Sequence, residues 1–476
     1  MCMTSSQEHN LPTLAHTLHE FQDCSDLIHR SIPSLGVDIL FIGNLISGDK
    51  LYRDLLNLIE NTDPEQLLQL VTQSQFVPVT DSKKLVINIL SGHAAFFYEN
   101  MAYAVDVSGN EGRSVSQSEQ ETTITGPHDA FTEDAGVGLG LLRKRIKSSH
   151  LKVIRLSVGE VTKSDVYVLY IKDIANMEYV NELKKRIQDI EIDAVLDSNM
   201  LIQLIDDSPY ALFPQILTSE RPDAIASKLV AGRVVGFMDG SPTAFSIPAS
   251  FAEFFSSSDD YYMRWMLGSA TRILRFIALF ITMIFTALYV SVTTYHYEMI
   301  PQNLILTLAE SRSRVPFPPV YEALLMELTI ELLREAGARL PTKIGQTIGI
   351  VGGIVIGQAG VQAGLTSNIL IIAVASSTIA SFVIPNYTMS ASIRLIRFGL
   401  ILLAGFWGNL GLALGLAAVM IHLSGMTSFG SSYLTPIAPS QPSEWRDVLF
   451  RAPFNKLYYR PSQTRTKNKI RNKMKR

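Results

Sequence analysis

The sequence predicts an α/β soluble N-terminal region, made of two small α/β subdomains, followed by an α-helical transmembrane bundle. The division rests on where the charges lie. From residue 1 to 275 charged residues recur steadily, and no uncharged run there approaches the roughly 20 residues that span a bilayer. Beyond residue 275, three runs contain no Asp, Glu, Lys or Arg: 276–297, 344–393 and 398–443. Because a charge in hydrocarbon is costly, such long uncharged runs indicate contact with lipid.

Overall composition agrees with this division. Hydrophobic residues make up 47% of the 476 residues and charged residues only 18%, which is low for a soluble protein. The domains that we expect are a polar leader (1–34), a first cytoplasmic subdomain (35–150), a second subdomain with a coupling region (151–270), a membrane domain (271–424) and a cytoplasmic basic tail (425–476).

Strand and helix patterns alternate in the soluble region, which predicts the two subdomains. The expected strands are 85–98 and 101–107 as a hairpin, 151–158, 165–171, 192–196, 233–238 and 243–247, and the expected helices are 177–190 and 199–205. The pair Asp239-Gly240 predicts a tight turn between the last two strands. The proline-rich segment 208–255 is expected to couple this region to the membrane.

The uncharged runs predict four membrane spans. The run 344–393 is too long for one crossing and divides at the polar residues 365–368. We therefore expect spans at about 276–295, 344–364, 369–388 and 398–423. The stretch 451–476 carries ten Lys and Arg and no acidic residue, so the positive-inside rule places it in the cytoplasm. We expect no cleavable signal peptide, and the N-terminal region is therefore expected in the cytoplasm too. An even number of spans satisfies both ends, although it leaves Arg394 and Arg397 outside.

A charged helix is expected over 320–340, before the second uncharged run. Glu327, Glu331 and Glu335 follow each other at every fourth position, so they form one acidic stripe. Two interpretations stay open. The helix lies on the membrane surface with its acids in water, or it packs against the bundle and its acids line a cation vestibule.

Glycine spacing is the most informative feature of the membrane half. A ridge of small residues lets helix backbones approach closely in lipid, and uncharged polar side chains there need partners or water. Pore lining by a ring of copies and packing against a neighbouring helix of the same subunit both fit this pattern. The residues concerned are Gly345, Gln346, Thr347, Gly349, Gly353, Gly357, Gln358 and Gln362.

Enzyme chemistry is not expected. The glycine cluster 136–140 lacks dinucleotide-binding spacing, the sequence has no phosphate loop or nucleophile elbow, and its nine His lack zinc-ligand spacing. We therefore expect no cofactor and no metal. The basic tail is interpreted as an anchor to anionic membrane lipid rather than as a nucleic-acid binding segment.

Several strings resemble the A subunits of the GerA family of spore germination proteins. The resemblance covers about residues 35–455, and the order and spacing of the strings carry it. They are ITGPHDAFTED (124–134), LLRKRIK (141–147), YIKDIAN (170–176), FPQ (213–215), TSERPD (218–223), GRV (232–234), VPFPP (315–319), REAG (334–337) and GQTIG (345–349). Thr125 and His128 depart from the family, which usually carries basic residues at these two places.

The resemblance implies a subunit of a nutrient germinant receptor in the spore inner membrane. It implies a multi-pass chain that acts with a nutrient-sensing B subunit and a lipoprotein C subunit, and a homo-oligomeric, pentameric ring that conducts cations. A membrane-anchored scaffold without a pore of its own is the alternative. Candidate interface residues implied by the shared motifs are Gly126, Pro127, Phe131, Thr132, Glu133, Pro214, Glu220, Arg221 and Pro222.

Overall fold

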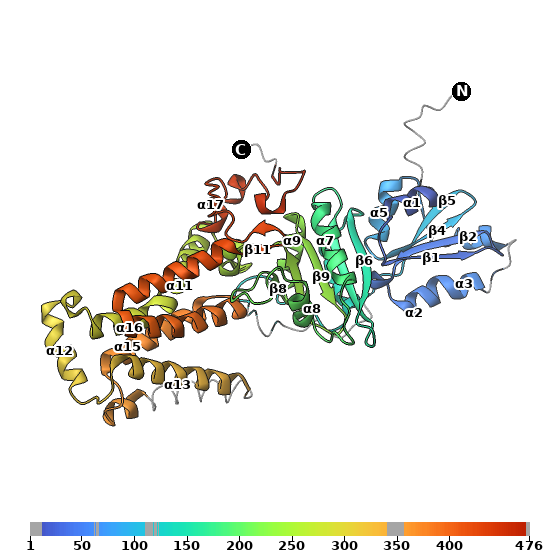
Figure 1. Cartoon of the computed structure of the whole chain (residues 1–476). Helices are drawn as coiled ribbons and strands as arrows, with labels where there is room; N and C mark the ends of the chain where they lie inside the picture. The colour runs from blue at the N-terminus through green and yellow to red at the C-terminus, as the bar shows by residue number, and fades with distance from the viewer. Residues whose placement is uncertain are drawn as a thin grey trace.

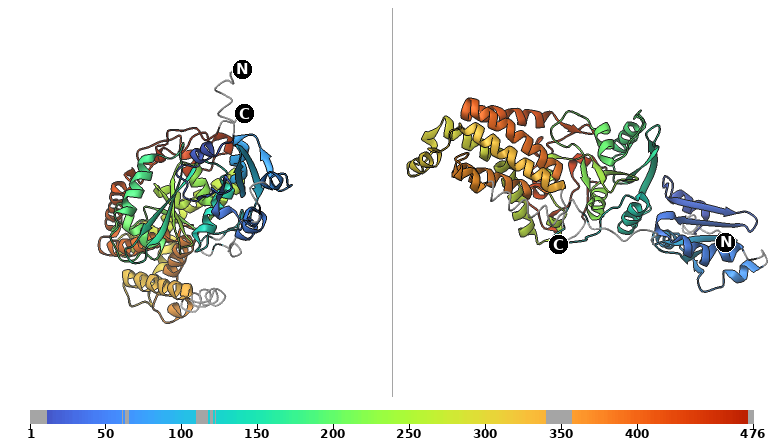
Figure 2. Two further views of the ribbon diagram at one scale, coloured as in Figure 1. Left: turned by 90° about the vertical axis from the view of Figure 1, so that its right-hand side faces the viewer. Right: turned by 90° about the horizontal axis from the view of Figure 1, so that it is seen from below.

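The computed structural model describes residues 12–60, 62, 66–109, 118, 121, 123–339 and 357–472. Two sheet-containing units and a helical region follow one another along the length of the molecule (Figures 1 and 2). The N-terminal unit lies at one end, the second unit lies in the middle, and the helices α11 to α16 form the other end. The predicted fold class is therefore confirmed.

The first unit is a five-stranded antiparallel sheet with helices on both faces. Alternate residues of one central strand face opposite layers: Ala94 and Phe96 pack with one set of helices, Ala95 and Phe97 with the other. In sheet order the strands are β1 (Leu27–Ile32), β2 (Val37–Ile42), β4 (His93–Tyr98), β5 (Met101–Asp106) and β3 (Val77–Val79). The helices are α1 (Leu14–Glu20), α2 (Gly48–Leu51), α3 (Asn57–Glu60), α4 (Leu67–Leu70) and α5 (Ser82–Ile89).

The second unit repeats this architecture. Val166 and Val168 face a core shared with α7 and α8, whereas Leu169 and Ile171 face a core shared with α6 and α9. Its antiparallel strands are, in sheet order, β6 (Leu151–Val158), β7 (Ser164–Ile171), β9 (Val234–Met238), β10 (Ala244–Ile247) and β8 (Leu217–Ser219). The helices are α6 (Ala135–Arg145), α7 (Met177–Gln188), α8 (Ser198–Ile205) and α9 (Pro222–Val230).

Five longer helices build the other end of the molecule. They are α11 (Trp265–Thr294), α12 (Gln302–Arg312), α13 (Pro319–Arg339), α15 (Asn368–Val383) and α16 (Tyr387–Gly425). Short elements join them to the second unit: α10 (Asp259–Tyr262), α17 (Trp445–Val448) and the two-residue strands β11 (Thr427–Ser428) and β12 (Ser431–Ser432). Among the described residues, α11 and α16 are long and apolar enough to cross a membrane, and α15 is a shorter apolar helix.

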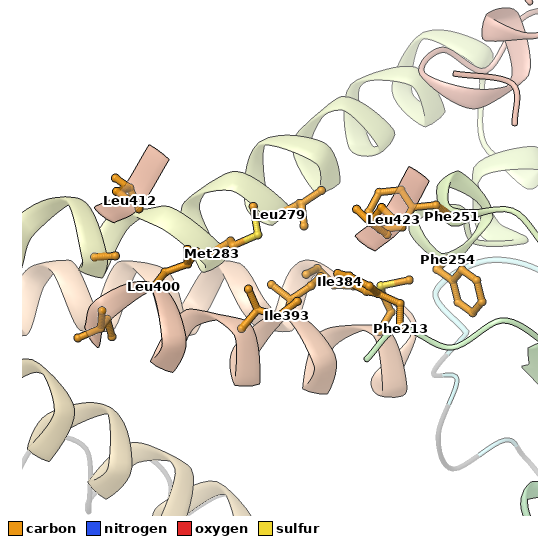
Figure 3. Close-up of a cluster of buried hydrophobic side chains, with 14 of the residues drawn as sticks. Phe213, Phe251, Phe254, Leu279, Met283, Ile384, Ile393, Leu400, Leu412 and Leu423 are labelled. Carbon is orange, nitrogen blue, oxygen red and sulfur yellow. The ribbon is translucent and has the colours of Figure 1, made fainter. Parts of the chain in front are cut away.

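Gly408 divides α16 into two antiparallel arms. Its backbone, with φ 60° and ψ −138°, is not helical and lies in a region that only glycine enters readily. A Cβ atom on Gly415 would come within 2.5 Å of Leu400, so the second arm returns along the first. Figure 3 shows Leu412 at the Leu400 end and Leu423 at the end of Ile384. The single span predicted at 398–423 is therefore wrong: the segment forms a hairpin of helices 387–407 and 409–425.

One apolar core joins the second unit to the helices. It brings Phe213, Phe251 and Phe254 together with Leu279 of α11 and Leu423 of α16 (Figure 3). The rings of Phe255 and Phe276 lie 5.3 Å apart, across the same junction. Because this core is continuous, the segment predicted to couple the two regions packs tightly against the first and last of these helices.

Several predicted elements need correction. The expected polar leader contains α1 and β1, so the first sheet begins before residue 35. Residues 85–89 of the expected hairpin belong to α5, because Leu85 and Ile89 meet the sheet as one helical face. Residues 192–196 are not a strand: Val195 is buried, but its segment has no ladder partner. The predicted strands 151–158, 165–171, 233–238 and 243–247 are confirmed.

Candidate functional site

The acidic stripe of α13 faces the helical bundle at its buried end. Glu327 lies 2.6 Å from the guanidinium of Arg397 in α16, and both side chains are 0% exposed. One turn on, Glu331 lies 3.2 Å from Arg394, which also donates to Ser390. Glu335 pairs instead with Arg339 of its own helix, and both are exposed. We call Glu327, Glu331, Arg394 and Arg397 the charge ladder.

Four helices converge on the inner pair of this ladder. Thr286 of α11 donates to Glu327 Oε1 at 2.9 Å, and Ser377 of α15 contacts the same oxygen at 3.4 Å. Arg397 Nη1 donates to Ser377 at 3.0 Å. The Arg397–Glu327 contact itself is ionic and does not have the angle of a hydrogen bond. The pair therefore ties α11, α13, α15 and α16 together at one buried point.

A second buried carboxylate lies nearer the start of α13. Glu322 accepts from the backbone N–H of Ser367 at 3.2 Å and lies 3.8 Å from Arg312 of α12. Ser367 Oγ and Tyr289 of α11 are 2.9 Å apart. The start of α13 thus meets the start of α15, and Arg334 near its end bonds Ser381 near the end of α15. Hence α13 and α15 run in the same direction.

These contacts change the interpretation of the charged helix. The membrane-surface alternative required all three acids to face water, and Glu327 does not. The last predicted span began only at residue 398, whereas α16 begins at Tyr387 and carries Arg394 and Arg397 into the bundle. The side of the membrane on which they lie stays a prediction. Charge in a low-dielectric interior is costly unless it is paired, and the two arginines supply the partners. Whether the acids form a cation vestibule stays a prediction.

Much of the predicted glycine helix lies outside the described residues. That holds for Gly345, Gln346, Thr347, Gly349 and Gly353. Of the remaining candidates, Gly357 approaches Ile371 of α15, and Gln358 and Gln362 are exposed in this chain. Exposed amides fit a pore wall and also a contact with another subunit, so the structure leaves both roles open.

A second cluster of charged residues lies where the second sheet unit meets α11. The buried Arg221, just before α9, forms 2.9 Å ion pairs with Asp223 and with Asp259 of α10. The next acid, Asp260, pairs with Arg272 and Arg275 of α11. Burial acts against ionisation of Asp223, but hydrogen bonds from Arg221 and Tyr262 hold its pKa below the ordinary value. Charge pairs therefore run from the second sheet unit into the first long helix.

The motif loop after residue 123 packs on this cluster. The backbone N–H of Ile124 donates to Asp259, and Gly126 (φ 119°) lies against the ring of Tyr262. Glu121 accepts from Ser219 at 2.9 Å, and burial raises the pKa of Glu121 to about 7. All these contacts are within one chain.

The other motif candidates have structural contacts of their own. Phe131 stacks on Phe237, and its N–H donates to the carbonyl of the buried Glu220. Thr132 has a buried hydroxyl, and the carbonyl of Glu133 accepts from Gly240. Further placements are Pro127 beside Gly126, Pro214, whose carbonyl accepts from Tyr433, and Pro222 at the first turn of α9. A role between subunits stays a prediction for this set.

The basic tail contacts protein where the sequence predicted contact with lipid. Gln463 is 4% exposed; it accepts from Arg233 and donates to the carbonyl of Ala249. Thr466 donates to the carbonyl of Ile174, and Arg460 donates to that of Val230. The tail therefore lies on the second sheet unit over residues 460–466, and the lipid-anchor interpretation fails for this part.

The sequence pattern does not identify the partners within these clusters. It leaves Arg394 and Arg397 outside the predicted spans, and it pairs neither Arg272 nor Asp259 with another residue. A usable signal existed: each arginine lies at the edge of an apolar run, where a charge needs a partner. Within the described residues no group of three or more His, Cys, Asp or Glu could hold a metal.

The chain is similar to known proteins along most of its length. The family model of the Bacillus/Clostridium GerA spore germination protein matches residues 15–463. Spore germination protein GerQA of Bacillus cereus is 45% identical over 387 residues, covering 81% of this chain and 78% of that protein. In Bacillus subtilis, spore germination protein KA (96% of this chain, 87% of that protein) and an uncharacterized membrane protein, YfkQ (92% and 88%), are each 36% identical.

Among solved structures, the chain aligns with the N-terminal domain of the A subunit of the Bacillus megaterium spore germinant receptor GerK3. The identity is 26% and the TM-score is 0.39, over 51% of this chain and 97% of that domain.

Proposed function

This chain belongs to the GerA family of spore germination proteins, and from that premise we propose that it forms an oligomeric, nutrient-gated cation channel. It would act as the A subunit of a germinant receptor in the spore inner membrane, together with a nutrient-sensing B subunit and a lipoprotein C subunit. A pentameric ring of A subunits would surround the pore.

The buried Glu327–Arg397 pair is the observation that carries the proposal. Charges inside a membrane bundle are rare and usually belong to ion pathways or switches, because burying a charge costs free energy and a simple membrane anchor does not require one. Here the pair joins four helices, so separating it would loosen all four at once. Such an element can have two arrangements, which is what gating requires.

The order of the helices supports a multi-pass topology. The start of α11 and the end of α16 both adjoin the second sheet unit through one core. The five described crossings would be α11, α13, α15 and the two arms of α16. Since α13 and α15 run in the same direction, the chain between them must return. We propose that the predicted span 344–364, which lies largely outside the described residues, is this sixth crossing. Six crossings keep both termini in the cytoplasm.

The cation pathway would involve the glycine helix of each subunit. Gln358 and Gln362 are exposed in the single chain, as residues facing a central pore would be. In the ladder, Glu327 and Glu331 are neutralised by arginines, so they would attract cations only after the pairs separate. This arrangement fits a closed state.

Potassium flux from liposomes tests the proposal. The chain is reconstituted alone and with its B and C subunits, and a panel of amino acids and sugars is added. We expect flux only with the partners and an active nutrient. Gly353→Leu should reduce it by at least tenfold if the glycine helix lines or packs the pore, whereas Gly399→Ala, on an open helix face, should not. No flux from any folded, oligomeric combination would overturn the channel.

A scaffold that passes a signal through contacts alone is the second candidate. The continuous core between the second sheet unit and the helices favours it, because such a core transmits movement without a pore. In that case nutrient would alter crosslinks between A and B subunits while potassium flux stays absent.

A further inference from the structure

Arg334 of α13 has no acidic partner in the part of the chain that the structure describes. Arg397 and Arg394 pair with Glu327 and Glu331, whereas no carboxylate among the described residues lies within ion-pair distance of Arg334. Its Nη2 donates to Ser381 at 3.0 Å, and its buried Nε has no partner. The nearby segment 340–356 contains no acidic residue that could supply one. Among the described residues, this part of the bundle therefore holds three arginines, at 334, 394 and 397, and only the glutamates 327 and 331 to pair with them.

The surroundings of Arg334 are cationic and open onto a cavity. The two acids of the ladder, Glu331 and Glu327, are already the ion-pair partners of Arg394 and Arg397. Arg334 and Arg394 both line a cavity of about 1450 Å³ that the helices, the second sheet unit and the C-terminal segment after residue 434 enclose together. Eleven Arg or Lys residues and five Asp or Glu residues line that cavity. An anion is the ligand that such a wall would attract.

Exposed aromatic side chains lie beside the two arginines that line the cavity. Arg334 lies 4.6 Å from the ring centre of Phe382, which is 69% exposed, and Arg394 lies 5.8 Å from that of Tyr387, which is 63% exposed. Both rings line the cavity at the end of the helices that adjoins the soluble units. Aromatic side chains with an arginine at that level are typical of the membrane–water interface. The site thus combines a cation for a phosphate group with apolar surface for an acyl chain.

We propose that Arg334 and the cavity beside it bind a phosphate anion, the headgroup of an anionic phospholipid in the cytoplasmic leaflet. The planar guanidinium suits phosphate, and its unpartnered Nε supplies a free donor. The headgroup would supply Arg334 with the negative charge that no described carboxylate provides. A free phosphate compound shares this chemistry, and the apolar rim favours the lipid.

Lipid retention by the purified full chain tests the site without requiring channel activity. Native mass spectrometry and thermal unfolding would be measured in detergent with added phosphatidylglycerol, phosphatidylcholine or inorganic phosphate. We expect saturable retention and stabilisation by phosphatidylglycerol. Arg334→Gln should weaken it about tenfold, and Arg334→Lys, which keeps the charge but loses the planar fork of donors, should weaken it by a smaller factor. Arg339→Gln, an exposed arginine of the same helix, should behave as wild type.

Each outcome decides between the sources or against the site. Stabilisation by inorganic phosphate alone, lost in Arg334→Gln, would assign the site to a free phosphate compound and overturn the lipid. Equal retention of phosphatidylglycerol by wild type and Arg334→Gln would overturn the site altogether. Because neither B nor C subunits are present, a failed flux experiment leaves this result unaffected.

Discussion

Glu327 of α13 and Arg397 of α16 form an ion pair with 2.6 Å between their charged atoms, and both side chains are completely buried. The sequence assigned the two residues to different places, Glu327 to a helix on or beside the membrane and Arg397 to a position outside the predicted spans. Their contact shows that α13 is part of the bundle. Substitution of either residue therefore tests how far the stability of the bundle depends on its buried charges.

Removing one charge of this pair should destabilise the protein more than removing both charges. Glu327→Gln or Arg397→Gln leaves the partner buried and unpaired, which costs about 3–5 kcal/mol. The double variant removes both charges and should lose less than either single one. Thermal unfolding of the four proteins in detergent gives this double-mutant cycle.

Glu335→Gln is the matched control, because its partner Arg339 is exposed and the change should alter stability by less than about 1 kcal/mol. Additive losses in the double variant would mean that the two charges do not interact.

The turn of the α16 hairpin depends on glycine. Gly408→Ala would strain the backbone at φ 60° and bring the new Cβ within 2.9 Å of His296 Nε2. We expect a loss of about 2–3 kcal/mol. Gly399→Ala, which meets nothing within 4 Å on a helix, should be neutral or stabilising by up to about 1 kcal/mol. Unfolding temperatures of both variants check the contrast; similar shifts would contradict the hairpin.

Asp206 should make stability fall as the pH rises. Burial and the neighbouring Asp207 raise the pKa of Asp206 to about 7, so the folded state holds a proton that the unfolded chain releases near pH 4. This contribution is present below about pH 4 and is lost as the pH approaches 7. Asp206→Asn should thus stabilise by about 1–3 kcal/mol at pH 8, after allowing for partial exposure, and change little at pH 4.5.

Asp207→Asn should change the stability at pH 8 in the opposite direction. Burial acts to raise the pKa of Asp207, but bonds from Thr427, Gly430 and Arg186 hold it below its ordinary value. The ionised form is therefore the one that the fold stabilises, and this variant should be less stable at pH 8. The same direction of change in both variants would show that Asp206 is solvated.

The docked tail gives a fourth prediction. Gln463→Ala removes the acceptor of Arg233 and the donor to Ala249, leaving buried groups unsatisfied at a cost of about 1–3 kcal/mol. Chymotrypsin should then cut after Tyr458 or Tyr459 at least several-fold faster, since cleavage follows local opening. Lys467→Ala, an exposed change in the same tail, should leave the rate unchanged, and equal acceleration would argue against specific docking.

Local patterns decided much of this fold before any contact was known. The strand 151–158, the helix over 319–339 and the apolar helices after residue 265 follow from the alternation and length of apolar residues, which depend on neighbours in sequence. Residues 85–89 show where such patterns fail, because a short apolar run fits a strand or a buried helix equally well and packing against the first sheet made it helical. Residues 192–196 form neither, because the segment has no strand to pair with.

By itself the sequence determined the fold class, the family and the presence of charges among apolar helices. Tertiary structure alone decided what those charges do. Glu327 has the same helical spacing whether it faces water or an arginine, because spacing fixes a face and not what covers it. Arg397 pairs with Glu327, no described carboxylate pairs with Arg334, and Gln463 of the tail accepts a hydrogen bond from Arg233. Each of these pairings joins segments far apart in the chain, so no local pattern could have specified them.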